Sequence, residues 1–208
     1  MAYDFKKENR ALYRPTTKPA LIDVPEMQFI TVTGDGDPNQ TGGQYAKALQ
    51  QLYTVAYTIK MSKMGDHHIQ DYFDFVVPPL EGFWWQPGVK GVDYQHKETF
   101  HFISAIRMPG FVNPDVLKWA ITEAANKKKV DASKVQLTTI TEGKCAQIMH
   151  IGPYDDEPAT VAKLHEFVAS QGLQLDYSDR RHHHEIYLSD PRRVKPERMK
   201  TVIRIPVK

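Results

Sequence analysis

Cysteine is almost absent from this chain of 208 residues, and neither a strong charge excess nor a long apolar run is present. The single cysteine, Cys145, excludes an intrachain disulfide and is most simply explained by a reducing compartment. Cys145 lies in an apolar run, which favours a small buried side chain over a nucleophile. The charged residues 1–10 lack the apolar core of a signal peptide, and no run is long enough for a membrane span. We therefore expect a cytoplasmic protein without a membrane partner.

The charge balance argues against a protein that binds nucleic acid directly. The formal net charge is +2, whereas such a protein usually presents a strongly basic face. The basic runs are 127–129 and 192–193, and solvated surface is the simpler interpretation of both. Hydrophobic residues make up 41% and charged residues 25%, as in ordinary globular domains, and the length suffices for a large core.

Alternating and helical patterns predict an α+β fold with an internal repeat. Residues 1–20 are polar and contain two prolines, so we interpret them as an N-terminal arm that precedes a domain at 21–208. Within this domain, two βαββ halves at about 27–109 and 144–206 each show a strand, a glycine-containing break, a helix and two strands. We expect antiparallel sheets packed by helices and related by a pseudo-twofold, with a ligand cleft between the halves. Oligomeric state is left open between a monomer and a homodimer.

The strand at 183–188 is the most informative segment for function. Residues two apart share a face of a strand, so His183, Glu185 and Tyr187 point one way and Ile186 and Leu188 the other. The first face places a carboxylate between two ring side chains. Such a carboxylate is either solvated or lies in a cavity, and we favour the cavity.

The repeat predicts a second acid in the same cleft. Aligning the third elements of the two halves places a strand at 71–77 beside the strand at 183–188, and Asp74 then falls at the position of Glu185. Tyr72 would share the inward face with Asp74. If both acids enter one site, their titrations are coupled.

Two further signals concern aromatic and histidine residues. Trp84 and Trp85 are adjacent, so in a strand they face opposite sides, and one can pack while the other faces a cleft or the surface. Adjacent His67 and His68 point apart and have no cysteine partner nearby, so we expect no metal site. Tyr45 lies on the apolar stripe of a predicted helix, where core packing is the simpler interpretation although it could line a site.

Several of these segments resemble the GyrI-like small-molecule-binding domains of the SOUL superfamily. The matching features are the doubled βαββ pattern and three segments, which are His150-Ile151-Gly152-Pro153-Tyr154, Glu185-Ile186-Tyr187-Leu188 and Pro78-Pro79-Leu80-Glu81-Gly82-Phe83-Trp84-Trp85. The resemblance covers nearly the whole chain from about residue 20. The proline- and tryptophan-rich segment is similar to a stand-alone branch that has no DNA-binding helix-turn-helix in front.

The resemblance implies a buried glutamate, here Glu185, in an aromatic cleft for planar hydrophobic compounds. The stand-alone branch looks like hydrolases that open the cyclopropane of DNA-alkylating cyclopropanoid compounds, a detoxification activity that gives drug resistance. Our hypothesis is that Glu185 deprotonates an attacking water and that Tyr72 hydrogen-bonds the carbonyl oxygen. The binding residues would be Trp84 or Trp85, Tyr187, Tyr154, Asp74 and His183. Release of ring strain means that the reaction requires no cofactor.

Three other functions remain open at this stage. A non-catalytic module could bind or sequester aromatic cations, with a possible regulatory role. An inhibitor of gyrase would need a strongly acidic surface, which the net charge of +2 does not favour. Haem binding would need an axial ligand such as His183, which competes with several ordinary surface histidines.

Overall fold

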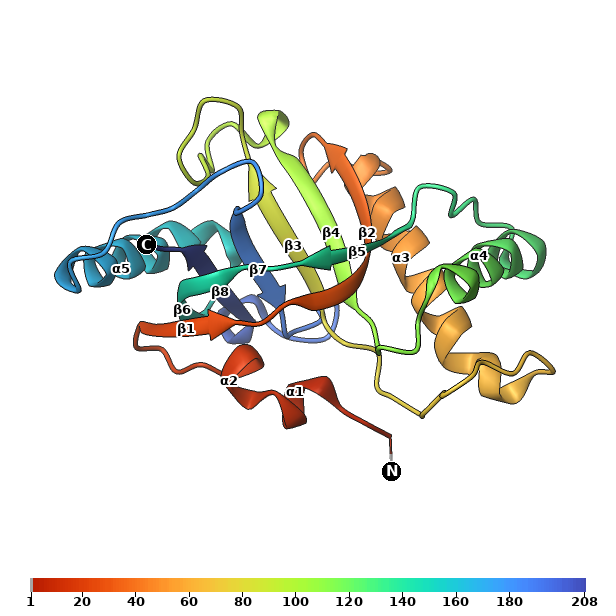
Figure 1. Ribbon diagram of the computed structural model, residues 1–208. Coiled ribbons are helices and arrows are strands. Elements are labelled where there is room, and N and C mark those ends of the chain that lie inside the picture. Colours follow the sequence, from red (N-terminus) through yellow and green to blue (C-terminus); the bar gives the residue numbers. More distant parts are fainter. Residues whose placement is uncertain (1) are drawn as a thin grey trace.

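The molecule is built around one antiparallel sheet of eight strands, in the order β1-β6-β8-β7-β3-β4-β2-β5 (Figure 1). The computed structural model describes residues 2–208. The strands are β1 (Ala20–Val24), β2 (Met27–Asp35), β3 (Leu80–Trp85), β4 (His101–Arg107), β5 (Gln136–Ile140), β6 (Gly143–Ile151), β7 (His183–Tyr187) and β8 (Lys200–Pro206). The helices are α1 (Phe5–Glu8), α2 (Arg10–Tyr13), α3 (Gln44–Met61), α4 (Pro114–Glu123) and α5 (Glu157–Ser170). Short 3-10 or π turns lie at Ser62–Met64, Lys97–Thr99, Ala124–Lys128, Tyr154–Asp156 and Pro196–Arg198.

The strand order confirms the expected α+β class and joins the two βαββ units in a single sheet. One unit is β2-α3-β3-β4 and the other is β6-α5-β7-β8, and they meet where β3 pairs with β7. The edge strands cross over between the units, because β1 precedes β2 in the chain but pairs with β6, whereas β5 precedes β6 but pairs with β2. These exchanged edges tie the two units into one body.

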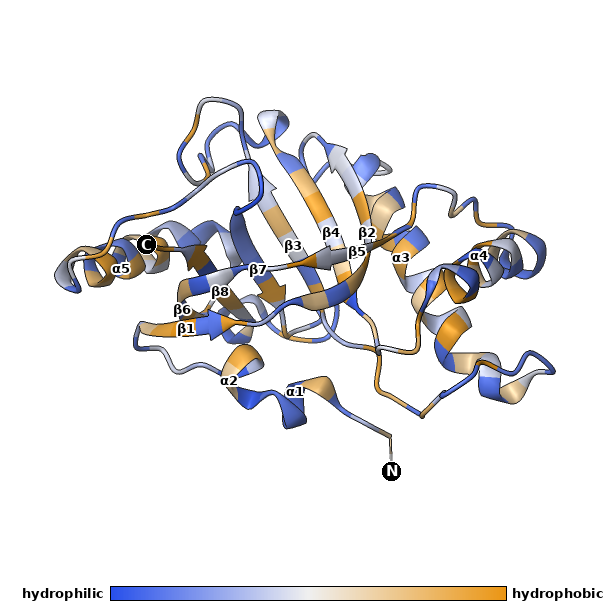
Figure 2. Ribbon diagram, viewed as in Figure 1, coloured by the Kyte–Doolittle hydropathy of each residue, from blue (hydrophilic) through white to orange (hydrophobic). Residues whose placement is uncertain are grey.

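Helices α3 and α5 lie on either side of the central β3–β7 pair (Figure 1). Their buried residues follow the helical period, with Leu52, Val55 and Ile59 in α3 and Val161 and Leu164 in α5. Figure 2 shows the resulting alternation of hydrophobic and hydrophilic residues along the helices. Because each helix covers its own half of the sheet, the seam between the halves is left without a helix above it.

The N-terminal segment is not the loose arm that its polarity suggested. It forms α1 and α2, and it buries Phe5, Leu12 and Tyr13. The Tyr13 hydroxyl donates to Glu81 Oε1 at 3.1 Å. Glu81 and Gly82 are neighbours in β3 and so point to opposite faces of the sheet. The segment therefore covers the face of the sheet opposite the seam residues Gly82 and Trp84.

The strand expected at 71–77 is wrong. Only an isolated parallel bridge, between Phe75 and Tyr3, forms in this segment, and Asp71 has a positive φ of 58°. The third element of the first half is β3, five of whose six residues are buried. A strand buried on both faces lacks the polar alternation that marks a half-exposed strand, and the alternation in 71–77 therefore drew the prediction to the wrong segment.

A buried ionic network lies beneath β3 and β7. The two ring nitrogens of His184 are each 3.0 Å from a carboxylate oxygen, one of Glu142 and one of Glu81. Both nitrogens must therefore donate, so His184 is an imidazolium. Arg204 Nη1 donates to Glu142 Oε2 at 2.9 Å, and Arg204 Nη2 donates to the backbone oxygen of Leu12 at 2.9 Å. The negative charges of Glu81 and Glu142 thus balance the positive charges of His184 and Arg204 in the interior. The network also binds the N-terminal segment to the sheet.

Candidate functional site

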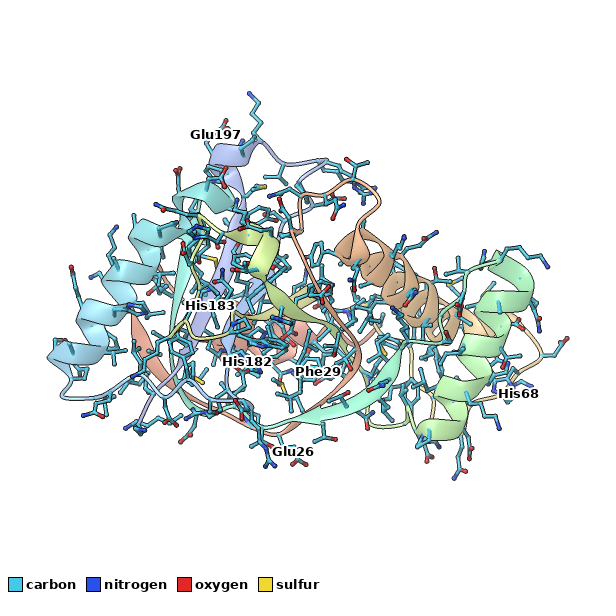
Figure 3. The ribbon with its side chains drawn as sticks, turned by 90° about the horizontal axis from the view of Figure 1, so that it is seen from above. Glu26, Phe29, His68, His182, His183 and Glu197 are labelled. Atoms are coloured by element: carbon cyan, nitrogen blue, oxygen red, sulfur yellow. The ribbon has the colours of Figure 1, made fainter. Side chains whose placement is uncertain are left out.

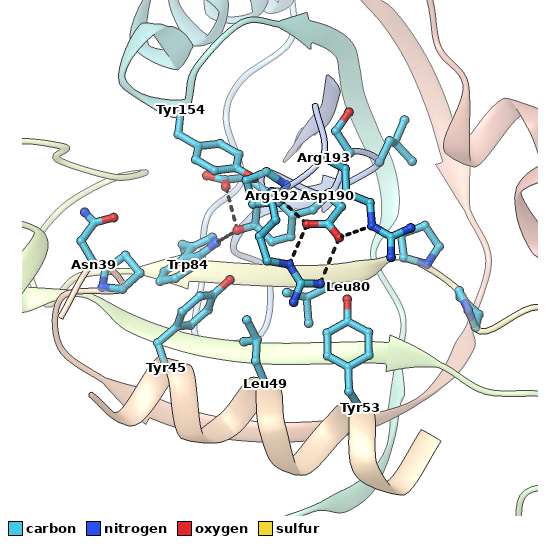
Figure 4. A pocket seen from close by; sticks show the side chains of 18 of the residues that line it. Asn39, Tyr45, Leu49, Tyr53, Leu80, Trp84, Tyr154, Asp190, Arg192 and Arg193 are labelled. Carbon is cyan, nitrogen blue, oxygen red and sulfur yellow. Dashed lines mark hydrogen bonds and ion pairs between the residues drawn. The ribbon is translucent and has the colours of Figure 1, made fainter. Parts of the chain in front are cut away.

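A cavity of about 990 Å³ lies over the seam between the two halves, with β3 and β7 as its floor (Figure 4). Trp84 and Glu185 come from this floor, Tyr45 and Leu49 come from α3, and Glu157 comes from the start of α5. We call this cavity the seam cleft. Aromatic rings form one part of its wall, Asp190, Arg192 and Arg193 line another part, and Glu185 lies on the floor.

The register of the floor determines which side chains enter the seam cleft. Gly82 pairs with Glu185, and Trp84 pairs with His183, so all four residues lie on one face of the sheet. A Cβ at Gly82 would lie 2.6 Å from Trp84 Nε1 and 2.9 Å from the Tyr187 hydroxyl. Only glycine at this position leaves space for the indole and the phenol to meet.

A chain of hydrogen bonds orients the Glu185 carboxylate. Trp84 Nε1–H donates to the Tyr187 hydroxyl at 2.9 Å, and that hydroxyl donates to Glu185 Oε2 at 2.8 Å. His183 Nε2 lies 3.1 Å from Glu185 Oε1 and donates to it. Burial raises the pKa of Glu185, but the hydrogen bonds from His183 and Tyr187 outweigh burial and hold the pKa below its ordinary value. Glu185 is therefore an ionised, oriented base.

Glu157 is a second acid in the seam cleft, with the opposite protonation state. Burial raises its pKa well above the ordinary value, and the negative charge of Glu185 and a hydrogen bond between the two carboxyl groups raise it further. No N–H or O–H group of the described residues donates to Glu157 Oε1 with good geometry, and the nearby Thr201 hydroxyl, which favours the ionised form, is outweighed by burial and by Glu185. The pair thus carries one proton and a single negative charge, as expected for adjacent buried carboxyls.

Aromatic rings form the walls around this pair. The Tyr45 ring lies 5.3 Å from the Trp84 indole, and the Tyr154 ring lies edge-on to Tyr187 at 5.7 Å. Burial raises the pKa of Tyr154 to about 12, so its hydroxyl is a neutral donor at physiological pH. Flat apolar surfaces with a few polar groups are suited to planar ligands.

Five of the eight residues predicted for the site are brought together by the structure. Glu185, Tyr187, Trp84 and Tyr154 line the seam cleft, and His183 lies beside Glu185. Side chains alternate between the two faces along β3. Trp84 therefore shares the face of Gly82 and enters the cleft, and Trp85 does not.

The structure does not bring the other three predicted residues to Glu185. The Tyr72 hydroxyl donates to the backbone oxygen of Lys60 at 2.6 Å, and the Asp74 carboxylate forms ion pairs with Lys60 at 3.2 Å and Lys63 at 2.8 Å. Trp85 lies on the opposite face of β3, where it stacks on His182 at 4.3 Å. Tyr72 and Asp74 were assigned to the cleft through the strand at 71–77, and that strand does not exist.

The sequence reasoning missed Glu157, Gly82 and Tyr94 as site residues and treated Tyr45 as core. Glu157 stands at the start of a helix and not in the strand at 183–188, from which the site was predicted. A signal was present, because Glu157 follows the predicted binding residue Tyr154 by three positions, so both residues lie at the same helix start.

The family model for the GyrI-like small-molecule-binding domain matches residues 17–208. The chain belongs to this family. GyrI-like domains bind small molecules, which agrees with a large cleft between the two halves of the fold. No functionally curated protein matches the chain.

Solved structures from Listeria innocua are very similar to this GyrI-like chain. A protein described as a hydrolase is 48% identical, with a TM-score of 0.89, and the match covers 99% of this chain and 100% of that one. An uncharacterised conserved protein from the same organism is 50% identical, with a TM-score of 0.93 and the same coverage. The C-terminal domain of EcmrR shares the fold at 13% identity, with a TM-score of 0.52, over 92% of this chain and 97% of that one.

The described residues show neither a metal-binding cluster nor a membrane-spanning helix. Within residues 2–208, no three His, Cys, Asp or Glu side chains are grouped in a way that could hold a metal ion. His67 instead stacks on Trp119 with ring centroids 3.9 Å apart. None of the helices in this range combines the length and the apolar character needed to cross a membrane.

We expect Gly82→Ala to damage the floor of the seam cleft. The added methyl group would force apart Trp84 Nε1 and the Tyr187 hydroxyl, and overpacking of this kind costs about 1–3 kcal/mol of stability. Chemical unfolding should show this loss, and a planar dye that quenches Trp84 should bind more weakly. Gly110→Ala is the matched control, since a Cβ at Gly110 has no atom within 4 Å. Equal behaviour of the two variants would contradict the packing argument.

Proposed function

We propose that the GyrI-like chain is a hydrolase that opens the strained cyclopropane of cyclopropanoid DNA-alkylating compounds. The observation that carries this proposal is the ionised, hydrogen-bonded Glu185 beside a protonated Glu157 at the bottom of an aromatic cleft. The Listeria innocua protein described as a hydrolase, at 48% identity over nearly the full length of both chains, supports an enzymatic role.

The reaction needs only a base and an oriented ligand. The planar rings would lie against Trp84 and Tyr45, with the cyclopropane carbon over Glu185. Glu185 takes a proton from water while the water oxygen bonds to the CH₂ carbon. The carbon–carbon bond then breaks, and its electron pair enters the ring as a phenolate.

The proton balance closes without a cofactor. The phenolate takes a proton from solvent, and Glu185 later returns its proton, so the sum is the addition of one water. Tyr154 takes the role first expected for Tyr72, because a neutral phenol in the cleft can donate to the carbonyl oxygen that becomes the phenolate. Neutral Glu157 keeps the charge of the pair at −1 and hydrogen-bonds Glu185 in its reactive orientation.

The test is a count of product molecules. Purified protein is mixed with a large excess of a spiro-cyclopropane dienone, and the water-opened product is quantified by mass spectrometry. Many moles of product per mole of protein would support a hydrolase. One equivalent or less of bound, unchanged ligand would instead support the second candidate, a module that sequesters aromatic compounds.

A further inference from the structure

A group of buried polar atoms without hydrogen-bond partners among the described residues lies around the Glu157–Glu185 pair. The group comprises His183 Nδ1, His165 Nε2, Thr201 Oγ1 and the hydroxyl of Tyr94. Buried polar atoms are almost always hydrogen-bonded in folded proteins, to protein or to ordered water. Four such atoms around one acid therefore require a common explanation.

The fold brings these atoms to the same region. Thr201 pairs with Tyr187 across β8 and β7, so it lies on the face of the sheet that carries Glu185. The Tyr94 ring lies 6.4 Å from the ring of His183 and perpendicular to it. Figure 3 shows His183 between α5 and the centre of the molecule.

Helix α5 extends this polar region toward the surface. His165 follows Glu157 by eight positions, which is about 12 Å along the axis of α5 and about 80° around it, so His165 leaves the helix farther along and in a different direction. Glu157 is buried beside Glu185, whereas His165 is only partly buried. Burial lowers the pKa of His165, and the nearby His183 lowers it further, so the two histidines lie near each other. His165 thus lies nearer to solvent than His183 and Glu185.

Hydrogen-bond chemistry indicates what joins them. His183 uses Nε2–H to donate to Glu185, so in the neutral ring Nδ1 is an acceptor that needs a donor. A hydroxyl at Thr201 or Tyr94 can both donate and accept. Water satisfies all of these groups at once, and internal waters typically make about three hydrogen bonds each.

We propose that a chain of bound water runs from His165 past His183 to Glu185 and supplies the nucleophile of the proposed hydrolysis. This inference rests on the proposed function. A planar ligand in the seam cleft displaces water from its floor, whereas a water held at His183 remains beside Glu185. Tyr94, His183 and Thr201 hold that water, and His165 stands at its outer end.

The first test locates the water directly. A high-resolution crystal structure of the full chain is expected to show ordered water within hydrogen-bond distance of Thr201 Oγ1, the Tyr94 hydroxyl and His183 Nδ1. Electron density that shows no ordered water at any of the three atoms would overturn the proposal whatever the enzymatic result.

The second test separates supply of water from ligand binding. Thr201→Val and His165→Leu are expected to lower kcat several-fold with KM unchanged, because they remove water ligands and leave the aromatic walls intact. Thr201→Ser keeps the hydroxyl and should recover most of the loss seen with Thr201→Val. His68→Leu, an exposed histidine beside α4 and far from His183, is the control for a histidine lost elsewhere (Figure 3).

The outcomes distinguish this inference from the proposed function. Ordered water combined with an unchanged kcat in both variants would overturn the supply role while the hydrolase stands. Ordered water combined with no turnover by the unmodified protein would reject the hydrolase and the supply role together. A lower kcat accompanied by lost water in the crystal of Thr201→Val would support the chain.

Discussion

Glu185→Gln is expected to lose turnover by about 10²–10⁴-fold, the range in which a positioned general base contributes. The amide has the shape of the carboxylate, so the aromatic walls and the floor should persist. It cannot take a proton from water, and it cannot accept hydrogen bonds at both of its terminal atoms. Binding of a neutral planar ligand should therefore change much less than kcat.

The measurement compares two quantities in the same preparation. Single-turnover mass spectrometry gives the rate of ring opening, and titration of Trp84 fluorescence with an unreactive planar analogue gives the affinity. Equal turnover by the Gln variant would remove Glu185 from the mechanism. A parallel loss of affinity and rate would mean that the charge of Glu185 serves binding rather than catalysis.

The pH dependence follows from the opposite shifts of the two acids. Glu185 has a pKa below its ordinary value, so the base is lost only when the solution becomes strongly acidic. Glu157 has a pKa well above its ordinary value, so the pair gains a second negative charge only at higher pH. The pair should give a broad, bell-shaped profile of kcat/KM. Glu157→Gln should remove the alkaline limb and retain the acidic one.

The sequence predicted the part of the site that one strand contains. Alternation along 183–188 placed His183, Glu185 and Tyr187 on one face, and the structure brings all three to the seam cleft. Within a strand, side-chain direction depends only on parity, which is visible in the sequence. The same rule decides between Trp84 and Trp85 once the pairing of β3 with β7 is known.

The residues that the sequence missed belong to contacts between distant elements. Glu157 acquires its raised pKa because the start of α5 meets β7, a contact between segments that are far apart in the chain. The N-terminal segment was misjudged for a different reason. Its buried residues Phe5, Leu12 and Tyr13 stand among charged neighbours, so their average hydropathy resembles that of a loose arm although each side chain contacts the sheet.

Glu142→Gln is expected to cost about 3–5 kcal/mol of unfolding free energy, as when one partner is removed from a buried ionic network. Glu142 accepts hydrogen bonds from both His184 and Arg204, and neither cation reaches solvent. Removal of its charge leaves two buried cations facing one remaining carboxylate, that of Glu81. Asp74→Asn is the matched control, because it breaks ion pairs of an exposed carboxylate, which contribute little.

The stability of the network should also depend on pH in a defined direction. Burial opposes ionisation of Glu142, but His184 and Arg204 lower its pKa from 4.5 to about 2. Its contribution is therefore complete above 4.5 and is lost as the pH falls toward 2. The carboxylates raise the pKa of His184 above 6.5 against the effect of burial, so its contribution is complete below 6.5 and is lost as the pH rises through the folded value. Maximum stabilisation from these two groups falls between 4.5 and 6.5.

Urea unfolding at a series of pH values measures both effects. The unmodified protein should lose stability on both sides of that window, and Glu142→Gln should lose most of the acid dependence. Because Arg204 also holds Leu12, the N-terminal segment should exchange its amide hydrogens faster in Glu142→Gln than in Asp74→Asn. A Glu142→Gln protein as stable as Asp74→Asn would mean that the buried charges do not hold the segment to the sheet. Its attachment would then rest on the apolar contacts of Phe5, Leu12 and Tyr13.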